Sequence, residues 1–195
     1  VEIAVTAPVL YELSSVVAVH REVYGRLGPV QLFYEVDWND LTPARLQAFA
    51  STPGAGLKVR MGGLSADRFP TASRVAEFLG TWAAHPIPLK ATAGLHQVLP
   101  HDDSEIKVRQ HGFLNLFAAA MLARRHQMSR DDLTAILQQT EAGRFEFDSQ
   151  GLETLGLRLT TAEVRELREQ VLSFGSCSFL EPVGSLVEHG FLELA

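Results

Sequence analysis

The sequence is organised around the stretch Ile87-Pro-Leu-Lys-Ala-Thr-Ala-Gly-Leu-His-Gln97, which reads as a short apolar strand that carries Lys90 and ends in a glycine and a histidine. A lysine in an apolar strand needs a physical reason, because a desolvated ammonium group is costly unless it is paired or faces a wet cavity. Lys90 is therefore either half of a structural ion pair or part of a functional site.

Three more strands precede this one, and a helical pattern separates each strand from the next. The strands are predicted at 1–6, 30–37 and 57–61, and the helices at 9–26, 43–51 and 70–84. Such alternation is typical of parallel strands joined by crossover helices. We therefore expect an α/β fold that is TIM-barrel-like or a partial (half) barrel. An open sheet is the other possibility, since four units fall short of the eight in a closed barrel.

The second half of the chain predicts more helix and a small β-hairpin. We expect an exposed polar loop able to act as a lid at 101–110, helices at 112–125, 129–140, 160–172 and 183–189, a hairpin at 144–159 and a last strand at 174–179. The whole of 1–195 reads as a single α/β domain. The chain starts without methionine and directly in a predicted strand, as a fragment of a longer protein would.

Composition excludes several classes of protein. The chain is 46% hydrophobic and 21% charged, which is typical of a globular domain. Its net charge of -6 and the lack of a clustered basic face argue against nucleic-acid binding. No apolar stretch has the length of a membrane span. One cysteine excludes an intramolecular disulfide and fits the reducing cytoplasm.

Three consecutive predicted strands share a pattern of faces. Residues two apart lie on the same face of a strand, so each strand has an apolar set and a set with charges near its carboxyl end. The charged sets contribute Glu35, Lys58, Arg60 and Lys90. Because α/β folds bind ligands at the carboxyl ends of strands, we expect these residues to line one cavity for a small anionic molecule. The alternative is an ion-pair cluster that only fills the interior.

Two chemistries suit Lys90. As a neutral amine it can attack a carbonyl and form a Schiff base, and as an ammonium group it can stabilise a carboxylate or phosphate. Gly62 and Gly63 would let backbone amides approach the anion, although a tight turn is the simpler role for a glycine pair. His96 lies just past the strand end, where a general acid or base belongs.

The remaining candidates surround the apolar helix and the cysteine. His111 precedes the helix and Asn115 lies one turn further on the same face, so both are candidates for binding substrate; a capping or surface role is the alternative for each histidine. Cys177 is expected to be a buried structural thiol. His96, His111, Glu35 and Cys177 lack the spacing of metal-ligand motifs, so we expect no metal and no cofactor.

Five stretches together resemble a family of uncharacterised bacterial proteins that are usually described only as hypothetical. They are Lys58-Val-Arg-Met-Gly-Gly63, Phe69-Pro70, Lys90-Ala-Thr-Ala-Gly-Leu-His96, His111-Gly-Phe-Leu-Asn115 and Phe174-Gly-Ser-Cys-Ser-Phe179. The similarity runs from about Phe33 onward and implies a barrel-like α/β fold without an established activity. The family has a second histidine where this chain has Gln97, which weakens any mechanism that needs a histidine pair. Lysines on strands also resemble class I aldolases, by architecture alone.

These observations predict a lyase or aldolase-type enzyme that acts on a small anionic carbonyl or phosphorylated compound. The expected catalytic residues are Lys90, His96 and Glu35, and the expected substrate-binding residues are Lys58, Arg60, Gly62, Gly63, His111 and Asn115. The alternative is a non-catalytic module that binds an anion or a partner protein. Such a module would cover its open strand edges by forming a homo-oligomer.

Overall fold

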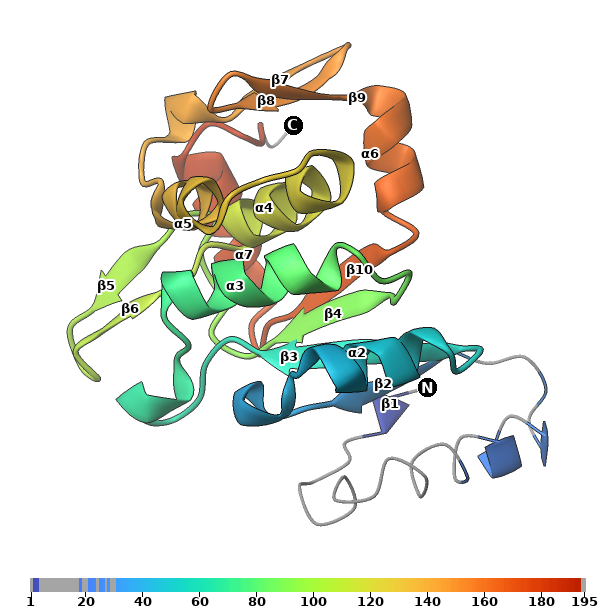
Figure 1. Cartoon of the computed structure of the whole chain (residues 1–195). Coiled ribbons are helices and arrows are strands. Elements are labelled where there is room, and N and C mark those ends of the chain that lie inside the picture. Colours follow the sequence, from blue (N-terminus) through green and yellow to red (C-terminus); the bar gives the residue numbers. More distant parts are fainter. Residues whose placement is uncertain are drawn as a thin grey trace.

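The computed structural model describes residues 2–3, 18, 21–23, 25–26, 28 and 31–193. Its main element is a parallel sheet of five strands in the order β1-β2-β3-β4-β10 (Figure 1). The strands are β1 (Glu2–Ile3), β2 (Leu32–Glu35), β3 (Ala55–Arg60), β4 (Leu89–Thr92) and β10 (Val171–Gly175). The predicted α/β class with parallel strands is thus confirmed. The described strands form an open row with β1 and β10 at its ends and do not close into a barrel.

Helices α2, α3 and α4 lie along one face of this sheet, and α5 packs on α3 and α4 as an outer layer (Figure 1). The helices are α2 (Pro43–Ala50), α3 (Ala72–Trp82), α4 (Phe113–Arg125), α5 (Arg130–Gln138), α6 (Thr161–Leu167) and α7 (Leu180–Glu188). The helix predicted at 9–26 lies largely outside the described residues. None of the described helices is long and apolar enough to span a bilayer.

Side-chain caps fix where four of these helices begin. The hydroxyl oxygens of Thr42, Thr71, Ser129 and Thr160 accept hydrogen bonds from backbone N–H groups in the first turns of α2, α3, α5 and α6. Each bond satisfies a donor that the helix itself leaves unpaired. The helices predicted at 43–51, 70–84, 129–140 and 160–172 are thus present as α2, α3, α5 and α6, with α6 ending earlier, at Leu167.

The core forms between the sheet and its helices from the predicted apolar sets of the strands. Leu32 and Tyr34 of β2, Leu57 and Val59 of β3, and Leu89 and Ala91 of β4 are all at most 4% exposed. The Tyr34 ring lies 5.7 Å from the ring of Phe49 on α2, measured between centroids. The alternation of faces expected for strands is thereby confirmed, and the charged sets must point to the opposite face.

The amino end of β4 is fixed by two helices. The Ile87 carbonyl accepts hydrogen bonds from Trp82 Nε1 of α3 at 2.8 Å and from Arg124 Nη2 of α4 at 3.0 Å. The guanidinium of Arg124 stacks 3.8 Å from the centroid of the Trp82 ring. Burial lowers the pKa of Arg124 to about 10. The start of β4 is therefore held in place by side chains of α3 and α4.

The polar segment predicted as an exposed loop is instead a β-hairpin. Strands β5 (His101–Asp103) and β6 (Val108–Gln110) pair antiparallel. Asp103 explains the turn, because its Oδ1 accepts hydrogen bonds from the backbone N–H groups of Glu105 and Ile106. A turn of this kind is stabilised by one polar side chain, so the spacing of apolar residues does not reveal it.

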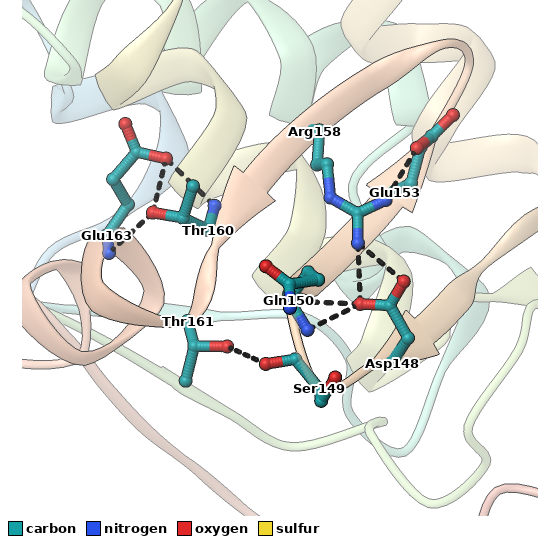
Figure 2. A network of polar contacts seen from close by, with 9 residues as sticks. Asp148, Ser149, Gln150, Glu153, Arg158, Thr160, Thr161 and Glu163 are labelled. Carbon is teal, nitrogen blue, oxygen red and sulfur yellow. Dashed lines mark hydrogen bonds and ion pairs between the residues drawn. The ribbon is translucent and has the colours of Figure 1, made fainter.

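The hairpin predicted at 144–159 is present and is extended by a third strand. The strands are β7 (Glu146–Asp148), β8 (Gly151–Thr154) and β9 (Leu157–Thr160), paired antiparallel in this order. Figure 2 shows that Arg158 of β9 binds Glu153 of β8 and Asp148 of β7. The hydrogen bond from Arg158 lowers the pKa of Asp148. One guanidinium thus ties together all three strands.

The loop after β4 closes over the start of α4. It turns through two residues with positive φ, Ala93 at 60° and Gly94 at 66°. Its carbonyl groups at Gln97 and Val98 then accept hydrogen bonds from the first two N–H groups of α4. Gly112, at the helix N-cap, allows this contact because a Cβ there would lie 2.5 Å from the Val98 oxygen and from the Leu99 Cα atom.

We therefore expect Gly112→Ala to destabilise the protein by about 1–3 kcal/mol, since the clash is with backbone that cannot rotate away. The matched control is Gly143→Ala, whose Cβ would meet no atom within 4 Å, and it should change stability by at most about 0.5 kcal/mol. Urea unfolding measures both. Equal stability of the two variants would show that the loop does not pack on α4 as described.

Candidate functional site

The predicted charged residues come together on the sheet face opposite α2, α3 and α4. In the parallel register, Glu35 of β2 pairs with Lys58 of β3, which pairs with Lys90 of β4, and Arg60 pairs with Thr92. Paired residues of adjacent parallel strands point to the same side, about 4.8 Å apart. We call Glu35, Lys58, Arg60 and Lys90 the charged face. The sequence has three lysines, and two of them are neighbours here.

Glu35 connects two of the three cations. Its carboxylate lies 3.1 Å from Lys58 Nζ and 3.3 Å from Arg60 Nη1. The Lys58 side chain is 13% exposed and that of Glu35 21%, whereas that of Arg60 is 50% exposed. The Lys58–Glu35 pair is thus substantially shielded from water, where an ion pair interacts more strongly than at the surface. Glu35 holds the ammonium and guanidinium groups in fixed positions at the carboxyl ends of the strands.

The two predicted glycines follow β3 after one intervening residue, Met61, and they allow close packing. A Cβ at Gly62 would lie 2.5 Å from the Phe69 ring and 3.0 Å from the Cα of Gly94, and one at Gly63 would meet Arg68. The loops after β3 and β4 therefore touch through glycine backbone. This close contact requires glycine at these positions, whether or not the backbone amides of Gly62 and Gly63 bind an anion.

His96 lies beyond the carboxyl end of β4 and contacts three residues that follow β10. Its Nδ1 is 2.6 Å from Glu181 Oε2 and 3.2 Å from Ser176 Oγ, and its Nε2 is 3.7 Å from Cys177 Sγ. Glu181 and Ser176 were not predicted as site residues. No local pattern could reveal them, because the contacts depend on β4 pairing with β10 across about 80 residues of chain.

The prediction of Cys177 as a buried thiol in a strand is wrong. The last strand was expected at 174–179, but β10 spans Val171–Gly175, and Cys177 follows it in an exposed loop. The strand begins earlier because Val171 pairs with Leu89 of β4 and joins the core. The thiol is therefore accessible from solvent.

His111 and Asn115 make buried contacts to backbone. The buried His111 Nε2 donates to the Pro70 carbonyl at 2.7 Å, before α3. Asn115 is fully buried and its Nδ2 donates to the carbonyl oxygens of Ile136 and Gln139 at the end of α5. These two predicted substrate-binding residues thus connect α4 to the elements around it. The structure shows no contact of either with the charged face.

No protein-family model, curated protein or solved structure matches this chain. The resemblance to a family of hypothetical bacterial proteins consequently stays a prediction.

The environment of His111 predicts a dependence of stability on pH. Burial lowers the pKa of His111, and also that of His101. In the unfolded chain a histidine has a pKa of about 6.5, so below that pH the unfolded state takes up protons that the folded state resists. The stability is therefore fully present above about pH 6.5 and falls as the pH drops toward the lower folded pKa, by at most about 1.4 kcal/mol per pH unit for each histidine.

We expect His111→Gln to reduce this loss, because glutamine can still donate to the Pro70 carbonyl but does not titrate. The measurement is the free energy of unfolding in urea between pH 7.5 and pH 5, a range set to lie above the titration of ordinary carboxylates at about pH 4. The dependence of the free energy of unfolding on pH that remains in the variant should come from His101. An unchanged slope in the variant would contradict the buried, neutral state of His111.

Proposed function

We propose that this protein is an enzyme of the lyase or aldolase type that acts on a small anionic carbonyl or phosphorylated compound at the charged face. The observation that carries the proposal is the direct pairing of Lys58 with Lys90 on the same face of two adjacent parallel strands. The charged face combines three cations with the single carboxylate of Glu35. This local excess of positive charge favours an anionic substrate.

The arrangement of the sheet supports a partial-barrel fold for this enzyme. Strands β1 to β4 lie side by side in their order along the chain, as barrel strands do, whereas the strand order reverses within doubly wound sheets. In addition, α2, α3 and α4 cover the same face (Figure 1). In a barrel the other face points to the interior, which opens at the carboxyl ends of the strands. We infer that the charged face occupies that position.

The residues of the charged face have separate roles in this proposal. Lys90, as a neutral amine, adds to the substrate carbonyl, and loss of water gives a Schiff base that accepts electrons from the bond to be cleaved. Lys58 and Arg60 bind the carboxylate or phosphate, held in place by Glu35. His96, beyond the end of the same strand as Lys90, transfers the proton. The single cysteine favours the cytoplasm as the compartment.

Borohydride trapping tests this chemistry. The protein is incubated with small keto acids, aldehydes and sugar phosphates, reduced, and examined by intact mass spectrometry and peptide mapping. We expect an adduct on Lys90 that is lost in Lys90→Ala and weakened in Lys58→Ala, because the second lysine binds the anion. Lys107→Ala is the matched control, since Lys107 lies in the turn of the β5–β6 hairpin, and it should keep the adduct. An adduct on Lys107 alone would contradict the proposal.

The alternative is a module that binds an anion or a partner protein without catalysis. It uses the same charged face, and β1 and β10, the edge strands of the sheet within the described residues, are where a homo-oligomer would form. The trapping experiment separates the two functions. Thermal stabilisation by phosphate or carboxylates without any adduct, together with a dimer in sedimentation, would favour the binding module.

A further inference from the structure

Three functional groups form a cluster where β4 and β10 end. These strands are neighbours in the sheet, so the residues that follow them, His96 and Cys177, emerge side by side at its carboxyl edge. The third group, Glu181, lies in the first turn of α7. The distances are 3.7 Å from Cys177 Sγ to His96 Nε2 and 2.6 Å from His96 Nδ1 to Glu181 Oε2.

The carboxylate determines which ring nitrogen of His96 carries the proton. An ionised Glu181 can only accept a hydrogen bond, so Nδ1 must donate to it and the lone pair of the neutral ring is on Nε2. That lone pair faces the thiol of Cys177. Cys177, His96 and Glu181 therefore stand in the order nucleophile, base and orienting carboxylate. Activated nucleophiles in enzymes use this order.

The positions of the two partners disfavour a metal site. Cys177 and Glu181 lie at opposite nitrogens of the imidazole ring, so their ligand atoms flank it and do not converge on one point. In agreement, the described residues contain no group of three histidine, cysteine or acidic side chains placed to hold a metal ion. Proton transfer between the Cys177 thiol and His96 Nε2 is the chemistry that this geometry supports.

The backbone around the cluster is held in place. Ser176 Oγ accepts a hydrogen bond from the N–H of Ser178 and also contacts His96, which fixes the turn that presents Cys177. On the other side, Ala93 adopts a φ of 60°, unusual for a residue with a Cβ, in the turn that leads to His96. Strained backbone of this kind is concentrated at functional sites.

We propose that Cys177 is a nucleophile for acyl transfer from small esters or thioesters, with His96 as its general base and Glu181 as a positioning residue. The Cys177 proton passes to His96 Nε2, and the sulfur adds to the acyl carbon. The bond to the leaving alcohol or thiol breaks, and His96 returns the proton to that group. The acyl group stays on Cys177 as a thioester until water or another acceptor takes it. The inference goes beyond the lysine chemistry and does not rest on it.

The alkylation rate of Cys177 tests the activation of the thiol. It is the only cysteine, so the protein unfolded in urea provides its own reference for the reaction with iodoacetamide. At pH 7 an ordinary thiol is only a few per cent thiolate, so we expect native Cys177 to react about tenfold faster or more than the unfolded chain. His96→Gln should remove this excess, while His85→Gln, before the opposite end of β4, should keep it. His101, which interacts electrostatically with His96, is the other titratable group to vary.

Two further measurements address Glu181 and acyl transfer. Glu181→Gln should slow alkylation and Glu181→Asp should restore part of the rate, whereas Glu188→Gln on the far end of α7 should have no effect. With p-nitrophenyl acetate we expect release of nitrophenolate and an acetyl group on Cys177 by intact mass, both lost in Cys177→Ala.

The proposal is overturned if native Cys177 reacts no faster than the unfolded chain, or if it is alkylated rapidly but never acetylated. Cys177→Ala should still form the borohydride adduct on Lys90. A failure of the proposed cysteine chemistry can therefore be distinguished from a failure of the proposed lysine chemistry.

Discussion

The parallel register of β2, β3 and β4 is the constraint on which the rest of the structure depends. It places Glu35, Lys58 and Lys90 in one row and buries the intervening apolar residues under the helices. Because side chains alternate along a strand, a slip of one residue in β3 would turn Lys58 into the core and expose Leu57. Desolvating an unpaired ammonium group is far more costly than losing one pairing, so the register is strongly specified.

Local signals in the sequence were sufficient for much of this architecture. Alternating apolar residues located the strands, and helical patterns located α2, α3 and α5. These features depend on residues within a few positions of one another. The grouping of Glu35 with Lys58 was also predictable, because parallel strands in sequence order bring equal positions together at one edge.

Features that depend on distant contacts were not predictable. The limits of β10 follow from its pairing with β4, and these limits decide that Cys177 is exposed beside His96. Likewise, Gly112 and Asn115 read as part of a motif, but the structure shows that they pack the β4 loop and α5 against α4. A residue can therefore belong to a distinctive pattern because it holds the scaffold of a site, without touching a ligand.

A double-mutant cycle between Glu35 and Lys58 tests the register most directly, with Glu35→Gln, Lys58→Met and the double variant compared by urea unfolding. The shielded pair should show a coupling free energy of about 1 kcal/mol or more. The exposed pair of Glu141 and Arg144 is the matched control and should give less than about 0.5 kcal/mol. No coupling between Glu35 and Lys58 would contradict the register, and with it the charged face on which the proposed function is built.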